Sequence, residues 1–307
     1  MSVRQFRTLC GQSHLSRLGR ETIPTAQNRT IPAVIHRKVC SCGVQISRFR
    51  QLPIVGTVAF IAIAKSSRVE NRSKMTEEVS LDLTLQNADQ LFDENHYQEV
   101  IDVLSKYSDQ DSAEIQWRKA RAYYSLSKSA KEKSEREKLI RQSYELIQQA
   151  LEKDDKNFAI HKWMAIVMDA NAELDGIKAR VSQLELMKNH ISRSLELNPD
   201  DPTTWHLLGA FEFALAELPW IQRKIVSAIF ATPPTGTYEK ALECFEKAES
   251  IKPGFYSSNW LMAGKCYLAL EKKKEAKEFL EKAANCRVLN EDDKKSKEEA
   301  TQLLKKI

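Results

Sequence analysis

The chain has 307 residues with only 9 glycines and 9 prolines, a composition that argues against a β architecture with many turns. Its net charge of +5 hides an asymmetry, because residues 1–74 hold 13 Lys and Arg against 2 acids, whereas residues 75–307 hold 34 bases against 40 acids. No run reaches the roughly 18 apolar residues that an unambiguous membrane span requires.

Residues 1–74 read as a basic leader that we expect to be mostly disordered. The leader is rich in Arg and Ser and nearly free of acids, which is typical of a mitochondrial transit peptide. An apolar run at residues 52–64 contains Pro53 and Gly56 and is too short for a span, so it is either a weak membrane anchor or simply part of the leader. Alternatively, the folded protein starts at Met75, where the composition changes.

Residues 75–307 carry a repeated pattern of large and small side chains. In a unit of about 34 residues, large residues recur in both helices of a hairpin and small ones recur where the two helices approach closely, which is typical of tetratricopeptide repeats. The units lie near residues 81–113, 114–157, 158–200, 201–254 and 255–289, and a capping helix follows at 291–307. We therefore predict an all-α solenoid of helical hairpins.

The first three units are the more divergent ones. Ala88, Leu91, Tyr97, Val100 and Leu104 mark the first unit. The second opens with Trp117, Ala120 and Tyr124, with Arg121 where a small residue is usual, and the third carries His161, Trp163 and Met164 on its first helix. By this register, the second and third units each contain an insertion of about ten residues.

The second unit also contains a charged stretch at residues 127–142. Its basic side chains are Lys128, Lys131, Lys133, Arg136, Lys138 and Arg141. One interpretation is a basic surface that attracts an acidic partner. The other is an ordinary solvated helix, in which Glu132–Arg136 and Glu137–Arg141 form pairs four residues apart.

The fourth unit matches the pattern in two halves that an insertion separates. Trp205 and Gly209 belong to its first helix, and Ala241 and Phe245 to its second. The inserted residues 214–237 contain an apolar helical stretch after Pro219. This stretch either contacts a partner or a membrane surface or, as we expect, packs on the solenoid as an extra lid.

The fifth unit fits the pattern without any insertion. Its large and small positions are Trp260, Gly264, Tyr267, Ala276, Leu280 and Ala283. A capping helix follows, with Asn290 as its predicted N-cap. Three acids lie in its first turn, where they interact favourably with the positive end of the helix dipole.

Motifs for catalysis or metal binding are missing from the sequence. Six scattered cysteines form no CxxC pair, and no histidine lies in an HExxH spacing. We expect Cys244 and Cys266 to be small buried thiols. There is no GxxxxGK[ST] or GxGxxG phosphate loop and no GxSxG elbow. The sequence therefore predicts a binding protein that is not an enzyme, with no cofactor, no metal and no nucleic-acid partner.

Three segments resemble the regulator of microtubule dynamics family. They are Ala159–Trp163 (AIHKW), Leu218–Trp220 (LPW) and Phe230–Phe245 (FATPPTGTYEKALECF). The resemblance runs from about Leu83 to Leu304. It implies a tetratricopeptide-like protein that associates with microtubules and the mitotic spindle and acts in chromosome segregation, with some members on mitochondria.

The residues and this resemblance together lead us to expect one of two functions. The first is a non-catalytic scaffold in the cytoplasm, on the cytoskeleton, the spindle and its poles, with residues 127–142 facing the acidic tails of tubulin and the repeat groove binding other proteins. The second is a mitochondrial or organelle-contact adaptor, with the leader as its address or membrane contact and the groove holding a peptide or lipid. The acidic body and the acidic surface of a microtubule repel each other, so the first function depends on local basic patches.

Overall fold

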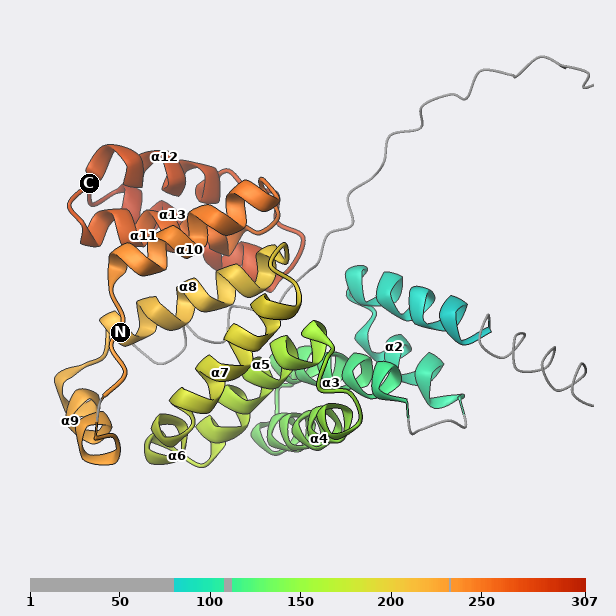
Figure 1. Cartoon of the computed structure of the whole chain (residues 1–307). Coiled ribbons are helices and arrows are strands. Elements are labelled where there is room, and N and C mark those ends of the chain that lie inside the picture. The colour runs from blue at the N-terminus through green and yellow to red at the C-terminus, as the bar shows by residue number, and fades with distance from the viewer. Residues whose placement is uncertain (1–79, 108–111, 232) are drawn as a thin grey trace, which may run out of the picture. The chain divides into compact units, whose positions relative to one another are not determined.

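The computed structural model describes residues 80–107, 112–231 and 233–307, and the basic leader with its apolar run at 52–64 lies outside these residues. Every regular element in the described part of the chain is a helix, which confirms the predicted all-α class (Figure 1). Asp82–Ile307 belong to one compact unit, and the description below concerns this unit.

A helix covering residues 80–93 is followed by twelve further helices in the described chain. Their bounds are α2 Tyr97–Ser105, α3 Ala113–Ser129, α4 Lys133–Lys153, α5 Phe158–Leu174, α6 Ile177–Ser182, α7 Leu184–Leu197, α8 Pro202–Ala216, α9 Trp220–Ile229, α10 Tyr238–Ile251, α11 Ser257–Ala269, α12 Lys273–Ala284 and α13 Glu291–Leu304. The predicted capping helix is α13, which ends at Leu304 rather than at the last residue.

Pairs of helices pack as hairpins that stack on one another. α3 pairs with α4, α5 with α7, α8 with α10 and α11 with α12, and α13 then covers α11 and α12. Each hairpin also contacts the next, because α4 packs on α5, α7 on α8 and α10 on α11. One hairpin alone could not bury its apolar side, so the stacking supplies a continuous core.

Small side chains lie where two helices of a hairpin come closest. A Cβ atom on Gly209 would sit 2.8 Å from the ring of Phe245, and one on Gly264 would sit 2.8 Å from Cγ of Leu280. Phe245 and Leu280 are fully buried in these contacts. Ala241, Ala276 and Ala283, at the small positions of the second helices, are fully buried as well.

The large aromatic residues of the repeats lie in the core or against it. Trp117 and Tyr267 are buried. Trp205 is half-buried against Phe255 and Tyr256, and its indole N–H donates to the carbonyl of Pro199 at 2.8 Å. An indole satisfies its single donor in this way while its rings stay in the core.

The insertions take three different forms. In the second hairpin they lengthen the helices, since α3 has 17 residues and α4 has 21. In the third hairpin, the short helix α6 separates α5 from α7. In the fourth, α9 lies between α8 and α10, and it contacts α6. None of the described helices is both long and apolar enough to cross a bilayer.

Candidate binding cavity

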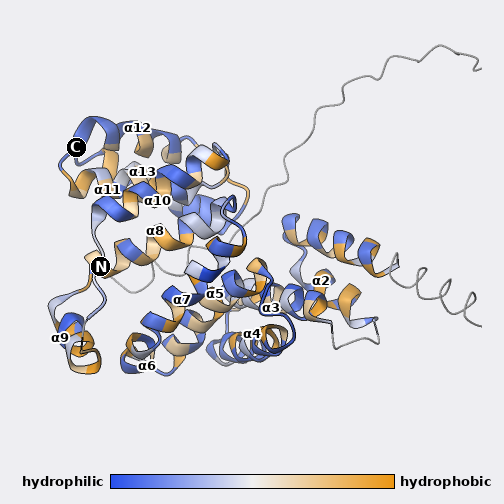
Figure 2. Cartoon of the chain, viewed as in Figure 1, coloured by the Kyte–Doolittle hydropathy of each residue, from blue (hydrophilic) through white to orange (hydrophobic). Residues whose placement is uncertain are grey.

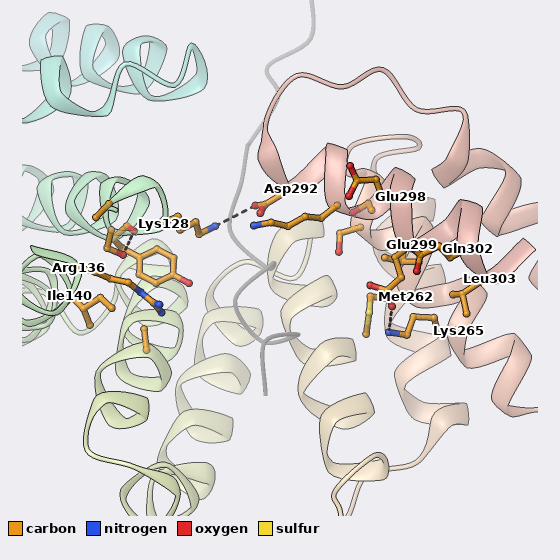
Figure 3. Close-up of a pocket in the computed structure, with 18 of the residues that line it drawn as sticks. Lys128, Arg136, Ile140, Met262, Lys265, Asp292, Glu298, Glu299, Gln302 and Leu303 are labelled. Carbon is orange, nitrogen blue, oxygen red and sulfur yellow. Dashed lines mark hydrogen bonds and ion pairs between the residues drawn. The ribbon is translucent and has the colours of Figure 1, made fainter. Parts of the chain in front are cut away.

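A cavity of about 720 Å³ lies between the second hairpin and the C-terminal helices (Figure 3). The last turn of α3 and the first half of α4 form one wall, and α11 and α13 form the other. Its lining includes Tyr124, Lys128, Arg136, Ile140, Leu261, Met262, Lys265, Asp292, Lys295, Glu298, Glu299, Leu303 and Lys306. Segments more than 100 residues apart in sequence thus face a common space, because the stacked hairpins bring α13 opposite α3.

One ion pair joins the two walls of this cavity. The ammonium of Lys128, in the last turn of α3, lies 3.3 Å from a carboxylate oxygen of Asp292 in α13 (Figure 3). The same ammonium lies 5.2 Å from the centre of the Tyr124 ring. Each charge also interacts favourably with the dipole of its own helix, because Lys128 lies at the C-terminus of α3 and Asp292 at the N-terminus of α13.

The first turn of α13 is held in place by polar contacts. The Asn290 side chain accepts from the backbone N–H of Asp293 at 2.9 Å, as its predicted N-cap role requires. The Asp293 carboxylate accepts from the Ser257 hydroxyl at 2.6 Å. Burial, together with the nearby carboxylate of Asp292, raises the pKa of Tyr97 in α2 to about 12. The N-terminus of α13 therefore presents negative charge to the first two hairpins.

A second ion pair lies on the C-terminal wall. Lys265 of α11 is buried, and its ammonium lies 2.8 Å from the carboxylate of Glu299 in α13 (Figure 3). It also lies 5.4 Å from the centre of the Phe213 ring. A buried ammonium needs such a partner, since an unpaired charge there would be strongly unfavourable.

The cavity lining combines apolar and basic side chains. Five bases and three acids line it among the described residues, although residues 75–307 together hold more acids than bases. Ile140, Met262 and Leu303 supply apolar surface beside these charges. The lining suits a ligand that presents apolar groups together with a negative charge.

Of the six basic residues predicted to form a tubulin-facing patch, Lys128 and Arg136 line this cavity. Lys131 and Lys138 are exposed, and Lys133 is 90% exposed beside Glu137 at 3.5 Å. These three lie on the α3–α4 turn and the outer side of α4.

Arg141, the sixth residue, is tied to the next hairpin. Its guanidinium bonds to the carboxylate of Asp175 at 2.5 Å and to the side-chain oxygen of Asn171 at 2.8 Å. Together with the cavity positions of Lys128 and Arg136, this arrangement divides the predicted patch between an inner wall, an inter-hairpin contact and an outer surface.

Met262 and Lys265 are cavity residues that sequence reasoning missed. They lie on α11, the first helix of the last unit, two and five residues after Trp260. Their position in the repeat unit could have predicted this role. In such units, residues of the first helix that follow the packed aromatic residue face the groove. A lysine at this position could equally lie on the outer surface. The contact of Lys265 with Glu299 is what places it in the cavity wall.

The described part of the chain contains buried thiols and lacks a metal-binding cluster. Cys244 and Cys266 are buried free thiols, as predicted, and burial raises the pKa of both, so they stay protonated. No group of three or more His, Cys, Asp or Glu side chains in the described part of the chain is placed to hold a metal ion. The arrangement can bind and orient a partner.

A sequence model of the regulator of microtubule dynamics protein 1–3 family matches residues 84–307, which is the whole repeat region. This chain belongs to that family. It is 37% identical over 254 residues to regulator of microtubule dynamics protein 1 of Pongo abelii, covering 82% of this chain and 79% of the relative. It is 34% identical over 186 residues to protein 3 of Xenopus laevis, covering 61% of this chain and 40% of that relative.

The solved structures support the fold assignment for this member of the family. The crystal structure of a thermophilic tetratricopeptide-repeat protein of Thermus thermophilus matches 72% of this chain and 98% of that one, with a TM-score of 0.51. The sequence identity is 13%, so the likeness concerns the fold alone. It confirms the predicted tetratricopeptide-like solenoid.

Proposed function

We propose that this chain is a non-catalytic, microtubule-associated scaffold that acts in spindle organisation and chromosome segregation. Its relatives are named as regulators of microtubule dynamics, and its body is a helical solenoid that offers surfaces for protein binding. The sites of action are the cytoplasm, the cytoskeleton, the spindle and the spindle poles.

The observation that carries this proposal is the local concentration of basic side chains on an acidic body. Lys131, Lys133 and Lys138 are exposed on the α3–α4 turn and the first turns of α4, and the neighbouring cavity adds Lys128 and Arg136. Positive patches of this kind attract and orient an acidic partner even where the net charge of the domain is negative. The acidic tails of tubulin have the required charge.

The cavity provides for a second protein. Its mixture of apolar and basic groups suits an acidic peptide segment with apolar residues, which would lie between α3–α4 and α11–α13. One chain could then join a microtubule, through the outer lysines, to a partner in the cavity.

An organelle-contact adaptor is the alternative, and the same lining favours it. Ile140, Met262 and Leu303 beside basic groups would also hold a lipid or a peptide of an organelle protein. In this function the basic leader would direct the chain to mitochondria or contact a membrane.

Co-sedimentation of the full chain with purified microtubules over a salt series tests the scaffold. We expect the bound fraction to fall steeply with salt, because contacts between exposed charges are screened. Replacing Lys131, Lys133 and Lys138 by Glu should lower the bound fraction several-fold at low salt. Absence of pelleting at every salt concentration would reject direct association.

A matched variant controls for net charge. Replacing Lys240, Lys247 and Lys273 by Glu, which are exposed on α10 and α12, changes the net charge by the same amount. This variant should pellet like the unchanged chain. Equal losses in both variants would show that the stretch at residues 127–142 is not the contact.

A further inference from the structure

Helix α9, which is inserted between the two helices of the fourth hairpin, turns its apolar side away from the body. At about 100° per residue, Trp220, Ile221, Ile225 and Ile229 lie on one arc of the helix, and Val226 lies on the opposite side. Of the ten residues of α9, all of them described, only Val226 is buried. Trp220 and Ile221 are each 67% exposed and Ile229 is 43% exposed, which corrects our expectation of a lid that packs its apolar face on the solenoid.

The orientation of α9 follows from contacts on its other side. The helix packs on α6, and Arg223 donates to the backbone carbonyls of Leu218 at 2.7 Å and Ala216 at 3.2 Å. Ala216 is the last residue of α8, where the C=O groups have no partner within the helix, and Leu218 lies in the connection to α9. Arg223 and Val226 therefore fix the helix with its isoleucines and tryptophan outward, where Figure 2 shows apolar residues on α9.

The surroundings of this apolar arc are basic. The sequences of α6 and α9 contain Lys178, Arg180, Arg223 and Lys224 and no acid, although residues 75–307 hold more acids than bases. Lys224 lies over the exposed ring of Trp220, with its ammonium 3.9 Å from the ring centre. A stem that packs along an apolar ring while its charge remains in water is the arrangement called snorkelling.

Neighbouring carboxylates are engaged by other partners. Asp175, just before α6, bonds to Arg141, and Asp169 bonds to Arg180 at 2.6 Å. Glu217, just before α9, accepts from the hydroxyl of Tyr238 at 2.5 Å. The arginines offset the charges of Asp175 and Asp169, whereas the neutral Tyr238 hydroxyl does not offset that of Glu217. Lys178 and Lys224 are both exposed and outnumber Glu217 at this surface.

We propose that α9 docks on the surface of an anionic lipid bilayer, with Trp220 and Ile221 in the interfacial layer and Lys178 and Lys224 at the headgroups. Interfacial helices combine an apolar face with flanking bases, and tryptophan prefers the boundary between headgroups and acyl chains. This surface is separate from the cavity and from the lysines at residues 131–138, so it extends the proposed function rather than resting on it.

A bilayer fits this surface better than a protein partner does. A helix of ten residues is about 15 Å long. A stable protein interface needs about 800 Å² on each side, well beyond one face of such a helix. A bilayer needs only a few inserted side chains and a nearby positive charge, and it gives a weak, reversible association.

Fluorescence quenching by brominated lipids tests this docking on the full chain. The vesicles contain phosphatidylcholine with or without about one third phosphatidylserine, and bromine is attached to the acyl chains. Trp220 is the exposed one among the five tryptophans, all of which lie outside residues 1–79. We expect quenching with anionic vesicles, little with neutral ones, and loss of that quenched component in Trp220→Phe. Vesicle binding without quenching would assign the contact to another segment and overturn the proposal.

A pair of variants separates docking from general stickiness. Replacing Ile221 and Ile229 by Ser should lower the fraction of chain that floats with anionic vesicles several-fold. Replacing Leu83 and Leu289 by Ser, which are exposed away from α9, should leave it unchanged, and circular dichroism verifies that both variants are folded. Equal flotation of the two variants would overturn the proposal, as would a dimer in light scattering that only the isoleucine variant abolishes.

Discussion

The second and fifth hairpins carry opposite side chains at the same position of the repeat unit. In the fifth, the position where the two helices meet holds Gly264, and Leu280 of α12 fills the space that the glycine leaves. In the second, the corresponding position holds Arg121, which is buried and bonds to Asp89 of the helix at residues 80–93. Close packing of backbones stabilises one end of the solenoid, and a buried charge network joins hairpins at the other.

The Arg121 network shows what such a replacement requires. The guanidinium lies over the rings of Phe92, at 4.1 Å, and Trp117, at 4.8 Å. Asp89 also binds Arg118 with both carboxylate oxygens, each at 2.9 Å. Burial lowers the pKa of Arg121 to about 10 in spite of the favourable charge of Asp89. The arginine is tolerated because rings enclose it and one carboxylate bonds to it.

Removing that carboxylate should have the largest effect on stability. We expect Asp89→Ala to lower the free energy of unfolding by about 3–4 kcal/mol, because a buried arginine loses its counter-charge. The value lies toward the lower end for a broken buried pair, since the Asp89 side chain is about a third exposed. Urea unfolding followed by circular dichroism measures the change.

An exposed ion pair provides the matched control. Asp175→Ala removes the carboxylate that pairs with Arg141 on the surface between the second and third hairpins. Exposed pairs contribute little, so this variant should unfold close to the unchanged chain. If Asp89→Ala and Asp175→Ala unfolded alike, the buried network would not be what joins the first two hairpins.

The regular part of this fold could be predicted from the sequence. Gly264, Ala276 and Ala283 recur at repeat spacing because two helices can approach only where side chains are small. The same reasoning placed Asn290 at the start of α13, since a side-chain acceptor is needed there. Local periodicity is thus sufficient for the helices and their pairing.

The cavity and the orientation of α9 could not be predicted from the repeat periodicity. The cavity exists because α13 returns to face α3, and the Lys128–Asp292 pair joins positions 164 residues apart. The orientation of α9 depends on two hydrogen bonds from Arg223, whereas its apolar spacing predicts the reverse. The repeat pattern specifies neither of these contacts.

Acid should weaken the fourth hairpin through His206. This imidazole is fully buried, its Nδ1 lies 2.9 Å from the side-chain oxygen of Asn259, and burial lowers its pKa from 6.5 to about 4. Between these values the unfolded chain binds more protons at this residue than the folded chain does, so stability is complete above pH 6.5 and is lost as the pH falls toward 4. From pH 7 to 4.5 we expect this histidine to contribute a loss of about 2–3 kcal/mol.

Urea unfolding at several pH values isolates that contribution. His206→Gln keeps a side chain that can bond to Asn259 but does not titrate. The variant should show a shallower fall in stability between pH 6.5 and 4.5 than the unchanged chain. Parallel curves for the two proteins would show that His206 does not govern the response to acid.

The smallest of these effects on stability concerns Gly264, which holds in the fifth hairpin the repeat position that Arg121 holds in the second. A methyl group in Gly264→Ala would meet Leu280 at 2.8 Å from Cγ, closer than the two atoms can approach. α12 must then shift or the leucine must change rotamer, so we expect the free energy of unfolding to fall by about 1–2 kcal/mol after the gain in helix propensity.

Adding Leu280→Ala in a double-mutant cycle distinguishes a clash from a general backbone effect. Leu280→Ala should cost less in the Gly264→Ala background than alone, because the new methyl group fills part of the cavity. Strict additivity would mean that this position does not set the distance between α11 and α12.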